Sequence, residues 1–379
     1  MKLCVLIDRE YPNDHSFIEG FYQKALPKQV DSVLFIGWSS LEKQFKRNDN
    51  TTYIIFKKSK IVFLRKVKYF LLTLTALYRH RKEIDAVITR NSIMMFFATR
   101  FLIFFEKRIQ HYHQISNLHA ETILDGYSRS KLYLFKARLE LIFRRVYLHK
   151  ANKIIAVSPW MKKYLLEKYS KVKRIIVIPL GVNMEDFLED VSTKREIDLI
   201  YVGTFNPLRR IDKIIEITKL MSEKISFNMH LISSENYNNQ HYLRIRKLID
   251  EQKLNKFITL SPRVTRRELI KLLYNSKIGL SVIPSYGHLK QISPTKLMEY
   301  MTAGCLVIAT KGIPEQDLIL QESKAGLLLE FDTKLVANKV IEVLENWNDF
   351  SDYGIIARQY MRSNRNYDSL VSTFIREID

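Results

Sequence analysis

The chain has 379 residues, of which 46% are apolar and 27% charged, and its formal net charge is +21. This length allows about two domains with buried cores, and the composition is that of an ordinary globular protein. Both cysteines, Cys4 and Cys305, lie in apolar runs. This pattern argues against a disulfide framework and predicts buried thiols in a reducing, cytoplasmic setting.

Neither a secretory signal nor a membrane-spanning helix is expected from the apolar runs. The first run reaches Asp8 after a few residues, and the longest, 93–105, has 13 residues and contains Arg100. A spanning helix needs roughly 18 or more apolar residues, and a signal sequence needs a longer apolar core than this start provides.

The positive charge is concentrated in one part of the chain. Residues 51–150 contain 20 Lys and Arg against 6 Asp and Glu, and the stretches 57–82 and 131–150 read as basic amphipathic helices. Such an excess favours an anionic partner, either membrane headgroups or nucleic acid. Because no common nucleic-acid-binding motif is present, we expect an anionic membrane surface, with simply solvated helix faces as the alternative.

In residues 1–190, short apolar runs alternate with longer helical patterns. Strands are predicted at 3–8, 33–36, 53–56, 86–90, 109–115, 154–157 and 175–179. Helices are predicted from residue 17, within 57–82, at 93–105 and 131–150, and after Ser158-Pro159, a pair that suits a helix start. The alternation indicates a doubly wound parallel sheet.

The apolar pattern lapses at 188–196 and then begins again. We therefore predict an N-terminal domain of residues 1–190 and a C-terminal domain of residues 191–379, whose last helix packs back on the first domain. Strands are predicted at 198–203, 229–232, 258–260, 278–283 and 327–329, with helices from residue 211 and from the capping-box sequence TRRE at 265–268.

The stretch 284–310 contains the clearest helix boundaries of the chain. Ser293 is a suitable N-cap, Pro294 suits the first helical position, and Gly304 suits the left-handed residue past the end. A strand is expected on either side, so the stretch reads as strand, loop, helix, turn and strand.

The start of this helix is a candidate phosphate site. Thr295 and Lys296 are its first residues, and a helix N-terminus offers unpaired N–H groups and a partial positive charge. Glu299, one turn later on the same face, can accept hydrogen bonds from the two hydroxyls of a ribose. The pattern suits a nucleoside diphosphate, whereas the alternative is a solvated Glu299 paired with Lys296.

Other phosphate and metal motifs are absent from the sequence. The eleven glycines contain neither G-x-G-x-x-G nor G-x-x-x-x-G-K-[ST], which makes hydride transfer and nucleotide-triphosphate hydrolysis unlikely functions. No C-x-x-C, H-E-x-x-H or Asp-x-Asp occurs, so side chains and helix ends must meet any phosphate charge. His111, His113 and His119 leave a metal site as an alternative to a structural or substrate-contacting role.

Four segments together resemble family 4 glycosyltransferases with the GT-B fold. They are IIAVSPWMKKYL (154–165), VIPLGVNMEDF (177–187), DLIYVGTFNPLRRIDKII (198–215) and SPTKLMEYMTAGCLVIAT (293–310), in the family's order. The resemblance implies an α/β fold of two facing Rossmann-like doubly wound parallel-sheet domains. It also implies that the C-terminal domain binds a nucleotide-diphosphate sugar, that the N-terminal domain binds the acceptor, and that the reaction is retaining, with neither metal nor cofactor.

The resemblance assigns donor-binding roles in the C-terminal domain. Gly203 ends the first strand, and Arg209 matches a basic residue that would hold the diphosphate by two hydrogen bonds and stabilise the leaving group. Thr204 replaces an upstream arginine of the family, for which Arg210 is the compensating candidate.

Two glutamates separated by seven residues are also typical of the family. Glu299 matches the second, which binds the ribose, while Gln291 replaces the first, which lies near the donor sugar. The backbone N–H groups of Thr295 and Lys296 would meet the diphosphate.

In the N-terminal domain, His113, His119 and Glu121 are candidates for the polar residue that contacts the donor sugar. Local hydrogen bonding is the alternative role for all three.

The sequence thus predicts a retaining hexosyltransferase. It would transfer a sugar from a nucleotide-diphosphate donor to a lipid-linked glycan in bacterial surface polysaccharide assembly, such as capsule or O-antigen, at the inner face of the cell membrane. Alternatives are a non-catalytic sugar-nucleotide-binding protein, a nucleic-acid-binding protein, or a GT-B epimerase or phosphorylase. Fold analogy alone supports the choice of pathway.

Overall fold

A computed structural model of the chain describes residues 1–12, 15–40, 44–48, 50–59, 62–127, 130–169, 172, 174–187, 195–350 and 352–378. The chain forms two compact units. Unit 1 comprises Met1–Leu124, Arg129–Pro179 and Tyr367–Asp379, and unit 2 comprises Asp125–Ser128 and Leu180–Asn366. The boundary predicted between residues 190 and 191 lies outside the described residues.

Unit 1 is built on an eight-stranded sheet with the order β3-β4-β2-β1-β5-β6-β7-β8. The strands are β1 (Lys2–Glu10), β2 (Ser32–Ser39), β3 (Gln44–Asn48), β4 (Thr51–Lys57), β5 (Ala86–Arg90), β6 (Gln110–Ile115), β7 (Lys153–Ala156) and β8 (Ile175–Val177). All neighbours are parallel except β3 and β4, which pair antiparallel. The predicted parallel sheet is therefore confirmed, with an edge strand that the sequence reading missed.

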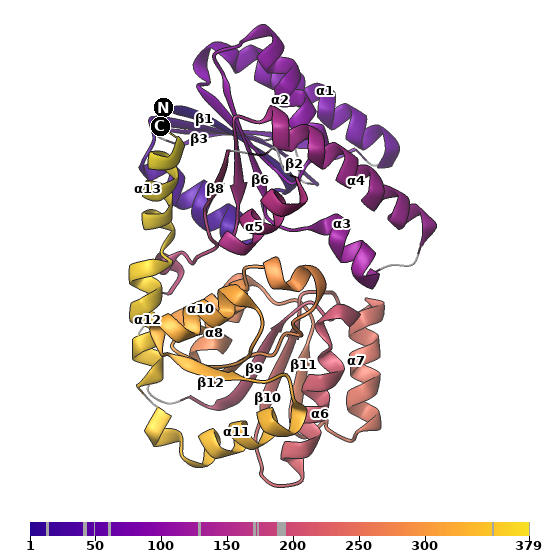
Figure 1. Cartoon of the computed structure of the whole chain (residues 1–379), viewed down its shortest axis with the longest axis vertical. Helices are drawn as coiled ribbons and strands as arrows, with labels where there is room; N and C mark the ends of the chain where they lie inside the picture. Colours follow the sequence, from indigo (N-terminus) through magenta and orange to yellow (C-terminus); the bar gives the residue numbers. More distant parts are fainter. Residues whose placement is uncertain are drawn as a thin grey trace. The chain divides into compact units, whose positions relative to one another are not determined.

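Helices cover both faces of this sheet (Figure 1). They are α1 (Val62–His80), α2 (Ile93–Phe105), α3 (His119–Thr122), α4 (Lys131–Lys150), α5 (Pro159–Lys168), α13 (Tyr367–Ile378) and the π-helical segment η1 (Ile18–Ala25). On one face, Phe96 of α2 and Tyr147 of α4 pack against His113 of β6. On the other face, α13 packs against β6 through Phe374 and Tyr112.

Unit 2 is built on a six-stranded parallel sheet with the order β11-β10-β9-β12-β13-β14. Its strands are β9 (Ile197–Gly203), β10 (Met229–Ser233), β11 (Ile258–Ser261), β12 (Ser276–Ser281), β13 (Leu306–Thr310) and β14 (Gly326–Leu329). Its helices are α6 (Ile211–Ser222), α7 (Gln240–Glu251), α8 (Arg266–Tyr274), α9 (Thr295–Thr302), α10 (Pro314–Ser323), α11 (Thr333–Glu345) and α12 (Tyr353–Asn364).

Side-chain caps fix several of the predicted helix starts. The Ser158 hydroxyl accepts a hydrogen bond from the Met161 N–H at 3.0 Å, and Pro159 follows at the first helical position. Thr265 accepts one from the Glu268 N–H at 3.3 Å. Each cap satisfies an N–H that the helix leaves unpaired, so both predicted starts are confirmed.

The described helices include none that is long and apolar enough to cross a bilayer. The two cysteines are free and buried, as predicted. Burial raises the pKa of the Cys305 thiol to about 11, so this thiol is protonated and packs as a small apolar group.

Helix α9 is held against the sheet through Tyr300. A Cβ added to Gly279 of β12 would lie 2.5 Å from the ring carbon Cγ of Tyr300, so only glycine allows this close approach. The Tyr300 hydroxyl oxygen accepts a hydrogen bond from the Val202 N–H of β9 at 2.8 Å. These contacts set the position of α9 relative to the ends of β9 and β12.

We predict that Gly279→Ala lowers the stability of unit 2 by about 1–3 kcal/mol, because the new methyl group overlaps the buried Tyr300 ring. The measurement is the urea-unfolding transition followed by circular dichroism. The matched control is Gly37→Ala, whose added Cβ would meet only the terminal Cδ1 of Ile55 at 3.3 Å. An equal loss in the two variants would contradict the assignment.

Candidate functional site

Arg209 lies on a short turn that follows the carboxyl end of β9. The turn η6 (Pro207–Arg209) is capped by Asn206, whose side-chain oxygen accepts from the Leu208 N–H at 2.7 Å. The Tyr286 hydroxyl donates to the Leu208 carbonyl oxygen at 2.7 Å. The backbone that carries Arg209 is therefore fixed from both sides.

The guanidinium of Arg209 is partly buried and forms no ion pair with any described residue. Burial lowers its pKa from the ordinary value, while Tyr201 and Tyr286 oppose that effect. Arginine remains protonated despite such shifts. Arg210 differs, because it pairs with Asp212 at 2.8 Å. The turn thus presents one desolvated cation without a carboxylate partner, which suits an anionic ligand.

Glu299 of α9 is almost fully buried, with 1% of its surface exposed. Its carboxylate accepts hydrogen bonds from Lys296 Nζ at 2.6 Å and from Arg266 Nη1 at 3.0 Å. Burial raises the pKa of Glu299, but the two cations outweigh burial and hold the pKa below its ordinary value. The expected pairing with Lys296 is present, whereas a solvated Glu299 is wrong.

The carboxylate of Glu299 keeps capacity for further hydrogen bonds. An ionised carboxylate has about four acceptor positions, and the structure uses one on each oxygen. Arg266 is itself anchored, because its Nε donates to Asp186 at 2.8 Å. Two acceptor positions of the Glu299 carboxylate are therefore not used by Lys296 or Arg266.

The start of α9 differs in one detail from the prediction. The helix begins at Thr295, and Pro294 takes the N-cap position with no capping side chain. Ser293 therefore does not act as the predicted N-cap, because the extended backbone at Pro294 places it one residue too far from the first turn. The N–H groups of Thr295 and Lys296 are left without a side-chain cap, which is the arrangement that a bound phosphate satisfies. Gly304 has a φ of 76° just past the helix end, as predicted.

Gln291 ends the short helical turn η7 (Gly287–Gln291). With its amide nitrogen directed at the turn, it donates to the carbonyl oxygens of Gly287 at 3.2 Å and His288 at 3.0 Å. The side-chain oxygen then points away from these carbonyls. Gln291 is therefore positioned by its own turn.

A pocket of about 220 Å³ in unit 1 brings together two of the predicted residues. Its lining includes His113 and His119, together with Arg9, Arg90 and Asn117. His119 is exposed at the start of α3, whereas His113 is buried on β6. The pocket lies at the carboxyl ends of β1, β5 and β6, where ligands commonly bind in open parallel sheets.

His113 is uncharged at neutral pH. Burial, together with the nearby charge of Arg144, lowers its pKa to about 3. The Thr89 hydroxyl lies 2.7 Å from His113 Nδ1 and 2.8 Å from His111 Nε2, so it joins the two rings. Among the described residues, no group of three or more His, Cys, Asp or Glu side chains is arranged to hold a metal ion.

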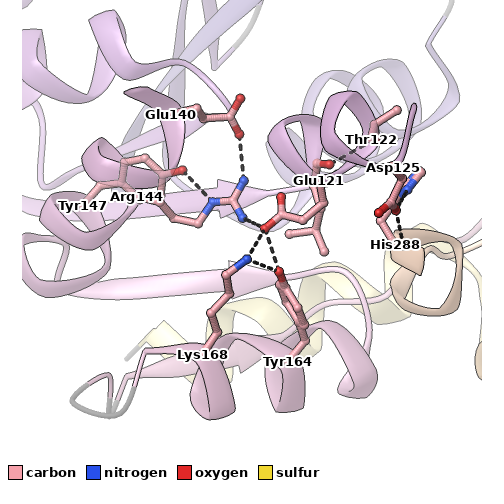
Figure 2. A network of polar contacts seen from close by, with 10 residues as sticks. Glu121, Thr122, Asp125, Glu140, Arg144, Tyr147, Tyr164, Lys168 and His288 are labelled. Carbon is pink, nitrogen blue, oxygen red and sulfur yellow. Dashed lines mark hydrogen bonds and ion pairs between the residues drawn. The ribbon is translucent and has the colours of Figure 1, made fainter. Parts of the chain in front are cut away.

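Glu121 belongs to a buried ion-pair network in unit 1 (Figure 2). Its carboxylate accepts from Arg144 at 2.5 Å, from Tyr164 at 2.7 Å and from Lys168 at 3.1 Å. Arg144 is fully buried and also donates to Glu140 at 2.7 Å. The network joins α3, α4 and α5, which favours the structural role of Glu121 over contact with a sugar.

The pairing of Glu299 with Lys296 was expected, but Arg266 and the cations that hold Glu121 were not predicted from the sequence. Arg266 follows the Thr265 cap and is adjacent to Arg267, and nothing in the sequence separates the two. The pairing of Arg144 with Glu140 could have been predicted, because Glu140 precedes Arg144 by four residues on α4 and side chains at this spacing are neighbours on a helix. The partner Glu121 is 23 residues away from Arg144 and has no such signal.

Two protein-family models match the chain. Residues 24–186 match the model described as Glycosyltransferase Family 4, and residues 184–360 match the model described as Glycosyl transferases group 1. An uncharacterized glycosyltransferase of Methanocaldococcus jannaschii is 23% identical over 314 residues, which cover 78% of this chain and 75% of that protein.

Solved structures with a similar fold cover the whole chain. Sucrose-phosphate synthase from Thermosynechococcus elongatus has a TM-score of 0.76 at 14% identity, over 99% of this chain and 97% of that one. HepE of Anabaena, solved in complex with UDP and glucose, has a TM-score of 0.72 at 12% identity. The match covers 100% of this chain and 99% of HepE. These similarities establish the fold.

We predict that Glu121→Gln lowers the stability of unit 1 by about 3 kcal/mol at pH 7, because it leaves Arg144 buried without its partner. Arg144, Tyr164 and Lys168 outweigh burial and lower the pKa of Glu121 to about 2. A carboxyl group whose pKa is lower in the folded state stabilises the fold at pH values above its ordinary pKa near 4.5. This stabilisation is lost as the pH falls toward 2. The difference between wild type and variant should therefore shrink over this range.

The measurement is urea unfolding at several pH values. Glu167→Gln is the control, because Glu167 is exposed and lies 3.9 Å from Lys163, so its loss should cost less than about 1 kcal/mol. A difference that does not change with pH would contradict the ionic role of Glu121.

Proposed function

This chain belongs to the glycosyltransferases with the GT-B fold, and from that premise we propose that it is a retaining enzyme with a nucleotide-diphosphate sugar as donor. The proposed acceptor is a lipid-linked glycan, and the proposed role is the assembly of a bacterial surface polysaccharide. HepE of Anabaena, which has a similar fold and binds UDP and UDP-glucose, supports the choice of donor class.

The observation that carries the proposal is the partly buried guanidinium of Arg209 in unit 2, which pairs with no carboxylate in the part of the chain that the structure describes. Leaving a buried charge uncompensated is costly, so a fold retains one where a ligand supplies the opposite charge. Arg209 and the uncapped start of α9 follow parallel strands and lie at the carboxyl edge of one sheet. Two sources of positive charge at one edge suit a diphosphate better than a single carboxylate.

Glu299 completes the proposed donor site. Its two unused acceptor positions suit the 2′- and 3′-hydroxyls of a ribose, because its contacts with Lys296 and Arg266 keep it ionised and fixed. Thr295 and Lys296 would contact the diphosphate through their backbone N–H groups. Gly203 ends β9, where an added Cβ would lie 2.8 Å from the Tyr201 hydroxyl, and we assign its backbone a place beside the diphosphate.

In the proposed reaction the acceptor hydroxyl oxygen bonds to the anomeric carbon on the face from which the diphosphate leaves. The anomeric C–O bond to phosphate breaks, its electron pair goes to the diphosphate, and a donor phosphate oxygen takes the acceptor's proton. Configuration is thereby retained. Arg209 would stabilise the charge that develops on the leaving diphosphate, and the proposal assigns no step to a metal or a cofactor.

Roles for the remaining predicted residues follow from their surroundings. Gln291 offers a side-chain oxygen to the donor sugar. His113 and His119, which line one pocket of unit 1, would hydrogen-bond sugar hydroxyls, with His113 acting as a neutral ring. Arg210 is assigned a smaller part than Arg209, because Asp212 already neutralises it.

We predict that one of UDP, GDP, ADP or CMP raises the thermal unfolding midpoint of the protein, and that Arg209→Ala weakens its binding by roughly 10- to 100-fold. Arg210→Ala is the matched control, with a smaller expected loss because its charge is paired. Thermal-shift titration of the three proteins measures these affinities. Stabilisation by no nucleotide, or equal affinities in wild type and Arg209→Ala, would overturn the proposed donor site.

A further inference from the structure

Helix α2 exposes only phenylalanine. The exposed positions of this helix are Phe97, Phe101, Phe104 and Phe105, with 37%, 55%, 76% and 54% of their surfaces accessible. Phe97, Phe101 and Phe104 follow one another at intervals of four and three residues, and Phe105 lies four residues after Phe101, so they form one stripe. A solvated helix normally carries polar residues at such positions, so the stripe needs another explanation.

The stripe continues onto the neighbouring helices. Tyr78 of α1 contacts Phe105 with ring centroids 6.5 Å apart, and Phe97 contacts Phe143 of α4 at 5.7 Å. Helices α1, α2 and α4 cover the same side of the sheet of unit 1 (Figure 1). We call the surface formed by Tyr78, Phe97, Phe101, Phe104 and Phe105 the aromatic face. Of the twenty large apolar side chains exposed in the described residues, twelve lie on these three helices.

The three helices that carry the aromatic face are rich in basic residues. Helices α1, α2 and α4 contain eleven Lys and Arg residues and a single carboxylate, Glu140, which is paired with Arg144. The only charged residue of α2, Arg100, donates to the Lys150 carbonyl at the end of α4. Apolar side chains bordered by cations match the apolar interior and negative surface of an anionic bilayer.

A pocket of about 470 Å³ lies between α1, the end of β4 and the start of α2. Among the described residues, its charged lining is Lys57, Lys58, Arg65, Lys66, Lys68 and the single carboxylate Glu140, and its apolar lining includes Trp38, Tyr69 and Met94. Arg65, Lys66 and Lys68 form no ion pair with a described residue. Cations beside apolar side chains suit a phosphate group that carries a hydrocarbon chain.

We propose that the aromatic face docks unit 1 on an anionic bilayer and that the pocket at the starts of α1 and α2 binds a lipid phosphate headgroup. The phenylalanines enter the boundary between headgroups and acyl chains, and the surrounding cations contact the headgroups. Nucleic acid suits this surface less well, because the exposed side chains of α2 are phenylalanines and the helix carries one cation. The inference deepens the proposed function and rests on it, since a lipid-linked acceptor is reached from the membrane surface.

The test is co-sedimentation of the full-length protein with vesicles of phosphatidylcholine, with or without phosphatidylglycerol. We expect tighter binding to the anionic vesicles. Phe101→Ser/Phe104→Ser should lose about tenfold in affinity for each phenylalanine. Arg65→Ser/Lys68→Ser should lose roughly tenfold or more on anionic vesicles and little on neutral ones.

The matched control is Tyr237→Ser/Ile355→Ser, which removes two unit 2 side chains that are 69% and 70% exposed, and it should bind vesicles as the wild type does. Unchanged binding of the phenylalanine variant would overturn the proposal. So would a dimer that this variant dissociates, because the face would then bind a second copy. Nucleotide-dependent thermal shifts, measured on the same proteins, report separately on the proposed donor site, so a failure of either idea is recognised by itself.

Discussion

The buried carboxylate of Glu299 is the constraint on which the candidate site of unit 2 depends. An ionised carboxylate with 1% exposure is tolerated only with cationic partners, and Lys296 and Arg266 supply them. Arg266 also pairs with Asp186. The guanidinium of this one residue of α8 therefore links α9 and the segment that contains Asp186 at one edge of the sheet. The same requirement keeps Glu299 ionised, and it uses one acceptor position on each carboxylate oxygen.

Unit 1 uses the same physical solution for a different purpose. Glu121 is held by Arg144, Tyr164 and Lys168, and this network joins three helices without leaving a cation unpaired inside it. Two other features do not follow this pattern: the partly buried guanidinium of Arg209, which pairs with no carboxylate of the described residues, and the exposed phenylalanines of α2. Both are unfavourable in the free protein, because desolvating a charge costs free energy and an exposed apolar surface is in contact with water. We therefore assign the first to the donor and the second to the membrane.

The sheets and most helices could be predicted from the sequence, because apolar runs and caps are local signals. Helices α2 and α4 have the predicted bounds, and the Ser158 and Thr265 caps form as predicted. Strand β3 was missed because QFKRN lacks an apolar run and its position depends on pairing with β4. The charge partners were missed for a similar reason, since Arg266 lies 33 residues from Glu299 in sequence and only the fold brings them together.

The most direct measurement is an experimental structure of the protein with the nucleoside diphosphate that stabilises it. We expect ribose hydroxyl oxygens within about 2.6–3.2 Å of the Glu299 carboxylate, with the diphosphate at the Arg209 guanidinium and at the first turn of α9. A nucleotide bound elsewhere, with Glu299 still contacting only Lys296 and Arg266, would contradict it.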